Sequence, residues 1–317
     1  MPVGAPEIDA QYRALREEAG LLDRSERAWL IVSGSEAGEF LQGQLTNDVE
    51  ALEPGSGCYA ALLDRKGKIR ADMRVLRVAE DRYLIDTEPE VAATVLGHLD
   101  MYRVGRDAEV TADEDAALLA LLGPRSEEIA LGGPLRPEHS HREVSIEGKE
   151  GRAIATDLGV DLLLRAEDFD VVRDALQAAG AEPIAPEAAE IARVESGRPR
   201  LGREMTESTM PQEAGINERA VSFTKGCYIG QETVARLHYK GKPNRHLRLL
   251  EPAGPVAAGD KIELDGKEIG TVGTAVISPA RGPLALAILR REAEPGTEVL
   301  VGGGTVAKVA ELSDDPA

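Results

Sequence analysis

Hydrophobic and polar residues alternate between strand-like and helix-like spacings over the first two-thirds of this chain. Apolar or alternating runs predict strands at residues 29–33, 58–63, 69–78, 82–86, 116–122 and 160–165. Helical spacing predicts helices at residues 13–23, 35–44, 89–102, 124–131, 166–179 and 186–196. Ser35 is expected to cap the second of these helices. Alternating strands and helices of this kind favour an α+β fold with ferredoxin-like units.

The pattern changes from about residue 246 onward, where only short strands are predicted. These strands occupy residues 261–264, 267–269, 271–277, 284–289, 298–301 and 305–312. Asp265-Gly266 separates the first two of them and is a strong hairpin signal. We therefore expect a small β-barrel or sandwich at the C-terminal end. A length of 317 residues suits two or three domains in total.

Composition excludes several functional classes. A net charge of −19 argues against general nucleic-acid binding, because a polyanion would be repelled. No apolar stretch approaches the roughly 20 residues of a membrane span, and no secretory signal is visible. Cys58 and Cys227 form no CxxC pair, which favours a reducing cytoplasm and no metal site. His139 and His141 lack an obvious third ligand and are expected to be solvent-exposed.

The segment 225–236, KGCYIGQETVAR, carries the strongest candidate chemistry. A helix is expected to begin at Gln231, with Cys227 just before it and Lys225 beside the thiol. A helix N-terminus and a nearby cation both stabilise a thiolate, so a reactive or ligand-binding thiol is one interpretation. The alternative is that Cys227 is a small residue that closes a tight turn.

The surrounding stretch is basic in an otherwise acidic protein. Its seven cationic residues are Arg219, Lys225, Arg236, Lys240, Lys242, Arg245 and Arg248. They could form a local anion site for a glutamate tail, a phosphate or an acidic partner. A solvated surface is the equally favoured alternative.

The block KGCYIGQE resembles the signature of the YgfZ family of folate-binding proteins. Further matching segments are ARVESGRPRLG, MPQEAG, GLLD, FLQGQLTND and GKIRAD, at residues 192–202, 210–215, 20–23, 40–48 and 67–72. The N-terminal matches are shared with the wider superfamily of the glycine-cleavage T-protein. The resemblance covers nearly the whole chain.

This resemblance implies a ring of three domains around a central folate pocket. The implied division is residues 1–50 with 115–203, residues 51–114 with 204–243, and a C-terminal β-barrel at 244–317. It also implies a cytoplasmic, monomeric accessory protein that supports the assembly or repair of iron–sulfur proteins without turnover of its own. The implied ligand is tetrahydrofolate or a one-carbon derivative, and the implied partners are iron–sulfur client or assembly proteins.

The resemblance also assigns site residues. Glu195 matches the position expected to accept the adjacent N–H and amino groups of a pterin, an arrangement that suits a carboxylate; the alternative is a surface helix residue. The other expected folate-binding residues are Asn47, Lys225, Tyr228, Gln231 and Arg236. Asn47 could instead be a simple cap. Cys227 and Asp72 are the expected functional side chains.

Position 71 departs from the pattern of the aminomethyl-transferring T-proteins. Those proteins carry two adjacent acids, whereas this chain has Ala71 followed by Asp72. A methyl group cannot relay a proton, so the sequence disfavours aminomethyl transfer. A tetrahydrofolate-dependent aminomethyltransferase of the glycine-cleavage type and a folate-binding regulatory module remain the two alternatives.

Overall fold

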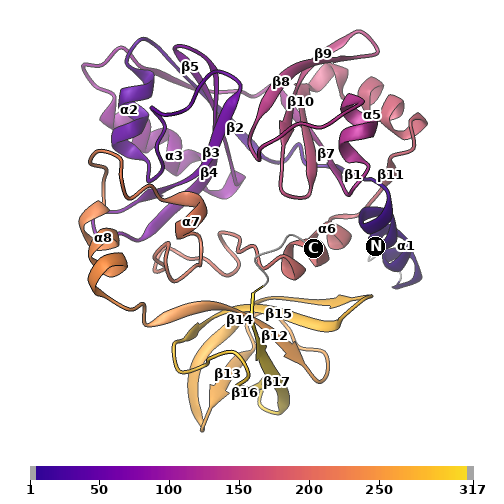
Figure 1. The fold of residues 1–317 in the computed structure, drawn as a ribbon, viewed down its shortest axis with the longest axis vertical. Coiled ribbons are helices and arrows are strands. Elements are labelled where there is room, and N and C mark those ends of the chain that lie inside the picture. The colour runs from indigo at the N-terminus through magenta and orange to yellow at the C-terminus, as the bar shows by residue number, and fades with distance from the viewer. Residues whose placement is uncertain (1–4, 313–317) are drawn as a thin grey trace. The chain divides into compact units, whose positions relative to one another are not determined.

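The computed structural model describes residues 5–312, which fall into two compact units (Figure 1). Among these residues, the first unit contains 5–63, 70–188 and 219–229, and the second contains 64–69, 189–218 and 230–312. Within the described range, no helix is long and apolar enough to cross a membrane.

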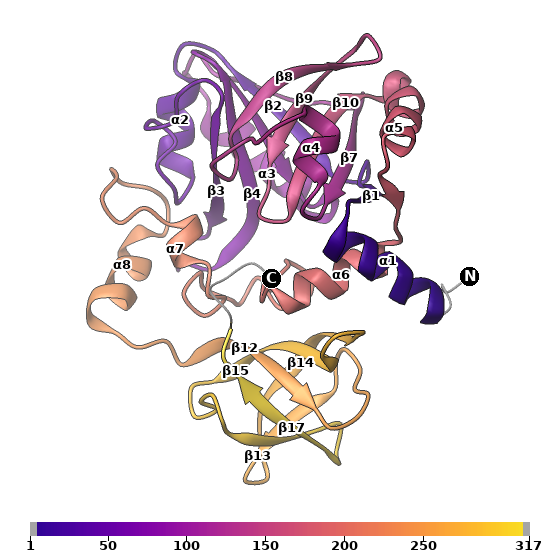
Figure 2. The same cartoon turned by 45° about the vertical axis from the view of Figure 1, so that its right-hand side comes forward.

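A six-stranded sheet in the first unit has the order β11-β1-β7-β10-β9-β8. Its strands are β1 (Gly20–Asp23), β7 (Ala116–Leu122), β8 (His141–Ile146), β9 (Lys149–Ala155), β10 (Gly159–Arg165) and β11 (Glu182–Pro183). The helices in this part of the chain are α1 (Ala5–Glu17), α4 (Ser126–Leu131), the 3-10 turn η1 (Ala166–Asp168) and α5 (Phe169–Ala178). Val172 and Leu176 of α5 pack against Leu119 and Leu121 of β7, and α4 lies against β7 and β10 (Figure 2).

A five-stranded sheet, also in the first unit, has the order β3-β4-β5-β2-β6. Its strands are β2 (Ala28–Ser33), β3 (Ser56–Leu63), β4 (Ile69–Ala79), β5 (Arg82–Thr87) and β6 (Glu109–Ala112). The helices α2 (Ala37–Gln44) and α3 (Pro89–Tyr102) bury Phe40, Leu41, Val95 and Leu99 in the apolar core on one of its faces.

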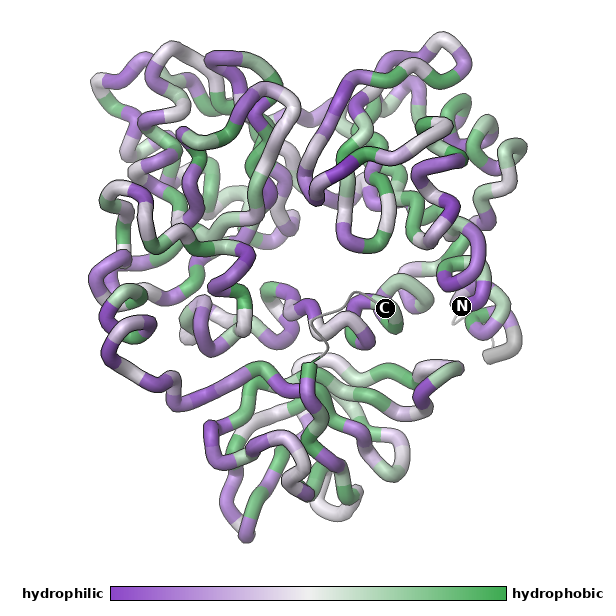
Figure 3. The backbone as a smooth tube through the Cα atoms, in the orientation of Figure 1, coloured by the Kyte–Doolittle hydropathy of each residue, from purple (hydrophilic) through white to green (hydrophobic). Residues whose placement is uncertain are grey.

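The opposite face of the five-stranded sheet packs on the six-stranded sheet. Trp29, Leu76 and Leu84 of the former share an apolar cluster with Leu118 and Ile154 of the latter. Because strand side chains alternate between faces, each sheet can bury both of its faces in this arrangement. The alternation of hydrophobic and hydrophilic positions can be followed along the strands in Figure 3.

A closed six-stranded barrel dominates the second unit, in the order β12-β15-β14-β13-β16-β17. Its strands are β12 (Arg245–Pro252), β13 (Lys261–Leu264), β14 (Lys267–Ser278), β15 (Gly282–Arg290), β16 (Glu298–Val301) and β17 (Thr305–Ala310). Asp265 and Gly266 both have positive φ, at 52° and 72°, which confirms the predicted tight hairpin. The remaining helices are α6 (Pro186–Glu195), α7 (Asn217–Ala220) and α8 (Gln231–Lys240). Val194 of α6 packs against barrel residues Leu249, Leu284 and Leu286.

The predicted α+β class with a C-terminal barrel is confirmed, and the six N-terminal strands begin and end within two residues of their predicted bounds. The helix expected at 13–23 is wrong in its second half. Leu21 and Leu22 are buried in β1, which is paired between β7 and β11. These partners lie about 100 or more residues away, so local spacing did not show the pairing.

Ser35 does not cap α2. Its hydroxyl donates to Asp107 Oδ2 at 2.6 Å, and Glu36 is the N-cap, without a side-chain hydrogen bond. Strand β2 pairs with β5 and β6, although the sequence-based division groups residues 1–50 with 115–203. The three-domain boundaries themselves stay a prediction.

Candidate functional site

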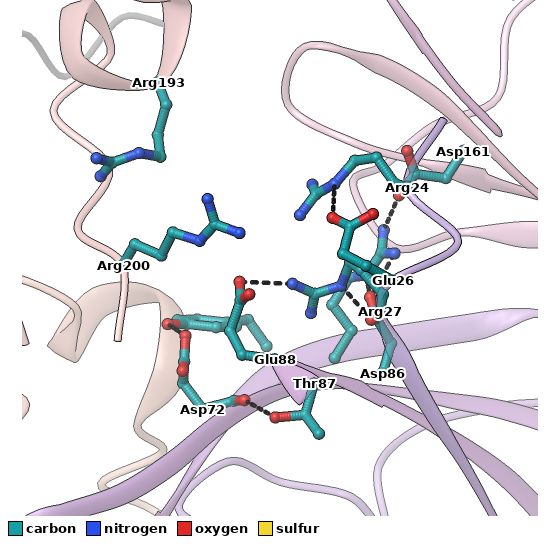
Figure 4. Close-up of polar contacts among 12 residues, drawn as sticks. Arg24, Glu26, Arg27, Asp72, Asp86, Thr87, Glu88, Asp161, Arg193 and Arg200 are labelled. Atoms are coloured by element: carbon teal, nitrogen blue, oxygen red, sulfur yellow. Dashed lines mark hydrogen bonds and ion pairs between the residues drawn. The ribbon is translucent and has the colours of Figure 1, made fainter. Parts of the chain in front are cut away.

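Asp72, on β4, has one carboxylate oxygen fixed and the other without a partner. The phenol of Tyr59, on β3, donates to Oδ2 at 2.6 Å. Thr87 Oγ1 donates to the Asp72 carbonyl at 2.7 Å (Figure 4). Oδ1 is buried and has no hydrogen-bond partner within residues 5–312. A buried acceptor left without a donor is unfavourable. Oδ1 is therefore the atom that a ligand can satisfy.

The environment of Asp72 favours its protonated form. Burial raises the pKa of Asp72, while the Tyr59 hydrogen bond and the Arg27 charge act in the opposite direction and Glu88 adds to the rise. A carboxyl group with a raised pKa holds a proton closer to neutral pH than a surface carboxylate does. The direction of the shift suits general acid–base chemistry.

Ala71 faces away from Asp72, because successive side chains on a strand point to opposite faces. It is fully buried with Met73 and Val75 in the apolar core between the five-stranded sheet and its helices. A carboxylate at this position would be buried among apolar groups. The inference that Ala71 removes an acid from the site is therefore wrong, and position 71 does not disfavour aminomethyl transfer.

An ion-pair network extends from beside Asp72 into the interface between the two sheets. Arg27 contacts Asp86 at 2.5 Å and Glu88 at 2.6 Å (Figure 4). Arg74 contacts Asp86 at 2.5 Å and Asp161, on the other sheet, at 2.6 Å. Burial alone would raise the pKa of Asp86, but the two arginines outweigh it and lower the pKa. The network holds a cationic group, Arg27, close enough to act on Asp72.

The signature segment is anchored to the end of α2 through Lys225. The buried Lys225 ammonium donates to the carbonyl oxygens of Gln42, Leu45 and Asn47 at 2.6, 2.7 and 2.8 Å. A cation at a helix C-terminus satisfies carbonyls that lack partners within the helix. Asn47 Nδ2 in turn donates to the carbonyls of Tyr59 and Arg219 at 2.8 and 2.9 Å. The structure thus brings Asn47 and Lys225 together as an anchor.

Cys227 is exposed, and Tyr228 is buried beneath the Lys225 ammonium, which lies 5.2 Å from the ring centroid. Burial raises the pKa of Tyr228 to about 12. Burial also raises the pKa of half-buried Cys58 to about 12, although Lys225 opposes the rise. The Lys225 charge therefore acts on Cys58, while the functional role of Cys227 stays a prediction.

Glu195 ends α6 and is buried rather than on a helix surface. Ser278 Oγ, at the end of β14, donates to its Oε1 at 2.5 Å. Two residues earlier, Arg193 contacts Glu190 at 2.7 Å and buried Glu204 at 3.0 Å. A buried carboxylate held by a hydroxyl is positioned to accept hydrogen bonds from a ligand. Its predicted role as the pterin acceptor remains compatible with this geometry.

Gln231 and Arg236 both lie on α8, whose start at Gln231 agrees with the prediction. Gln231 is half-buried in the first turn, and Arg236 is exposed. Both residues belong to the second compact unit with Glu195, whereas Asp72, Asn47 and Lys225 belong to the first. Their roles in ligand binding stay predictions.

The expectation for the two nearby histidines is wrong. His139 and His141 are both buried, because residues 141–146 form β8 and not an exposed loop. Arg152 Nη1 lies 3.0 Å from His141 Nδ1, and His141 Nε2 lies 3.1 Å from the Ser56 carbonyl. In the part of the chain that the structure describes, no group of three or more His, Cys, Asp or Glu could hold a metal ion.

Sequence reasoning missed Tyr59, Arg27 and Arg219 around Asp72. The Arg219 guanidinium lies 5.2 Å from the centroid of the Tyr59 ring. The scarcity of aromatic residues, at 3%, was the one signal that could have singled out Tyr59. Arg27 had none, and Arg219 was named only as one of seven cations of a possible anion site. The proximity of both arginines to Asp72 depends on pairing between distant segments.

Comparisons with known proteins agree with this fold. Residues 4–225 match the family model described as the GCVT N-terminal domain. The chain is 27% identical to an aminomethyltransferase of Staphylococcus carnosus, over 95% of this chain and 87% of that protein. It is also similar to the crystal structure of glycine cleavage system aminomethyltransferase T from Bartonella henselae. That match has a TM-score of 0.87 and 25% identity, and it covers 100% of this chain and 91% of the other.

The fold is an α+β architecture with a C-terminal barrel, similar to that of the aminomethyltransferase from Bartonella henselae. The family match spans well over half of the chain. The chain belongs to the GCVT-domain family, whose members include aminomethyltransferase relatives.

Proposed function

We propose that this protein binds tetrahydrofolate and catalyses one-carbon transfer of the aminomethyltransferase type. The observation that carries the proposal is the Asp72 carboxyl group, with Oδ2 held by Tyr59 and a buried Oδ1 that awaits a donor. Similarity to aminomethyltransferases over nearly the whole chain supports the same reaction class.

The chain offers residues that suit a reduced folate. The buried Glu195 carboxylate, held by Ser278, would accept the adjacent N–H and amino groups of the pterin. When bound, the folate supplies the nitrogen that accepts the one-carbon unit. Asp72 takes up or releases the proton at Oδ1, since burial raises its pKa toward the working range. Tyr59 stays protonated and keeps Oδ2 occupied, because burial and Asp72 raise the pKa of Tyr59 well above its usual value.

The direct test separates binding from transfer. Purified protein is given tetrahydrofolate and an aminomethylated lipoyl carrier, and ammonia release is measured beside folate-dependent thermal stabilisation. Glu195→Ala should abolish the stabilisation, which is about 2.7 kcal/mol for a ligand at 100 times its Kd. Asp72→Asn should retain it while ammonia release falls by about 100-fold or more. The exposed Asp100→Asn is the matched control and should change neither.

A second function is favoured by Cys227, which is exposed on a segment that Lys225 anchors firmly. The KGCYIGQE block resembles that of folate-binding accessory proteins for iron–sulfur enzymes, and an accessible thiol suits such a role. Under this alternative, Cys227→Ser lowers iron–sulfur enzyme activities in the native host but spares glycine cleavage. Purified protein that binds folate without releasing ammonia would favour the accessory role over the transferase.

A further inference from the structure

Arg219 lies between two groups that fix its position. Its Nη2 donates to Glu138 Oε1 at 2.5 Å, and its backbone carbonyl accepts from Asn47 Nδ2 at 2.9 Å. The guanidinium carbon lies 5.2 Å from the centroid of the Tyr59 ring. A cation over an aromatic face is attracted by the ring, so the stacking and the ion pair hold both side chains in place.

Tyr59 passes this restraint on to Asp72. Its hydroxyl donates to Asp72 Oδ2 at 2.6 Å, and rotation of the ring would misdirect that bond. The charged or titratable groups that act on Tyr59 are Asp72, Arg219 and Arg27, and those that act on Asp72 are Tyr59, Arg27 and Glu88. Arg27 is itself bound to Asp86 and Glu88, whereas Arg219 reaches Asp72 only through the phenol ring.

We propose that Arg219, held by Glu138, is a positioning residue that keeps the Tyr59 hydroxyl on Asp72 Oδ2 and so leaves Oδ1 as the reacting oxygen. This deepens the proposed function and rests on it only in taking Oδ1 as the oxygen that reacts. Glu138 precedes β8 and Arg219 lies in α7, so two segments far apart in the chain cooperate to orient one carboxyl group. The arrangement makes the Glu138–Arg219 pair a support for the site and not a ligand contact.

Loss of the pair has a defined electrostatic consequence. Without the cation the phenol is a weaker and less well-directed donor, so the ionised form of Asp72 is less stabilised and its pKa rises. Loss of a hydrogen bond to a charged carboxylate changes the ionisation constant of that carboxyl group by roughly 10- to 100-fold. A partly exposed cation–π contact corresponds to about a two- to five-fold change. Tyr59→Phe should therefore raise the pKa of Asp72 more than Arg219→Gln does.

The test follows the Asp72 carboxyl carbon by NMR titration of protein labelled with 13C aspartate, with Asp72→Asn used to assign the signal. No folate is present, so the result does not depend on the proposed function. We expect Tyr59→Phe to raise the midpoint of the Asp72 titration by about one to two pH units. Arg219→Gln should raise the same midpoint by a few tenths of a pH unit. Arg219→Lys, which retains the cation, should bring the midpoint most of the way back to the wild-type value. Arg103→Gln, at a half-buried position in a separate ion pair, is the control.

Glu138→Gln gives a second route if Arg219→Gln is poorly folded, since it retains the guanidinium but removes its ion-pair partner. It should produce a shift in the same direction and of smaller size. The proposal is overturned if Arg219→Gln and Glu138→Gln leave the Asp72 midpoint where Arg103→Gln leaves it, or if Tyr59→Phe does not move it. A midpoint shift without any ammonia release by the wild-type protein would uphold the positioning role while refuting the transferase.

Discussion

Replacing Lys225 with methionine tests whether the signature lysine is an anchor or a folate ligand. Methionine retains most of the side-chain volume but removes the ammonium that binds the carbonyls of Gln42, Leu45 and Asn47. As an anchor, Lys225 should matter for the stability of the first unit. Folate affinity of the protein that remains folded should be unchanged.

The expected change in the free energy of unfolding of Lys225→Met is the balance of two opposing contributions. The buried carbonyls of Gln42 and Leu45 lose their donor, which destabilises the fold by about 1 to 3 kcal/mol each, whereas water can reach half-buried Asn47. Against this, burial lowers the pKa of Lys225 from 10.5 to about 8. At about 1.4 kcal/mol per pKa unit, removal of the ammonium recovers about 3 kcal/mol. We expect a net loss of about 1 kcal/mol, and at most about 3 kcal/mol, in the free energy of unfolding.

Urea denaturation followed by tryptophan fluorescence measures this loss. Trp29 is the only tryptophan and is buried in the first unit, so its emission reports on the part of the protein that contains Lys225. Lys149→Met, at a partly exposed ion pair with Asp168, is the control and should shift the midpoint little. An unchanged midpoint for Lys225→Met, together with weakened folate binding, would refute the anchor and restore Lys225 as a ligand.

The pH dependence gives an independent check. Because the pKa of Lys225 is about 8 in the fold and 10.5 ordinarily, the unfolded chain binds more protons between these values. Wild-type stability should therefore rise with pH over this interval, by at most about 1.4 kcal/mol per unit. Lys225→Met lacks this gain, so the difference in unfolding free energy between wild type and variant should widen as the pH rises from 8 to 10.5. A difference that narrows above pH 8 would contradict a lowered pKa.

Three further predictions concern other buried or exposed groups. Iodoacetamide near neutral pH should label exposed Cys227 much faster than Cys58, whose pKa burial raises to about 12; equal labelling in peptide maps would contradict this. Asp161→Asn should destabilise the first unit by about 3 kcal/mol, because it removes a buried carboxylate and leaves half-buried Arg74 with one anionic partner instead of two; urea titration measures the loss. Burial lowers the pKa of His141 from 6.5 to about 4, so the unfolded state binds more protons between these values and stability falls as pH drops. The loss should approach about 3 kcal/mol by pH 4, and His141→Gln should flatten the curve in acid unfolding followed by fluorescence.

The sequence by itself determined the local elements. Strand and helix periods placed strands such as β7 and β10, and Asp265-Gly266 placed the hairpin of the barrel. These features depend on neighbouring residues, whose spacing sets which face is apolar and which turn is allowed. The motif resemblance likewise led to the fold that the comparisons confirm.

Only the tertiary structure decided what the side chains do. Ala71 lies in the apolar core, and Lys225 binds carbonyls about 180 residues earlier in the chain. The Arg219 guanidinium lies over the ring of Tyr59. His141 is buried in a strand. A local pattern records period and polarity, but hydrogen bonds and ion pairs between distant segments depend on how sheets pair and pack. Residue type therefore indicated which groups could act, and packing between distant strands determined their partners, burial and charge.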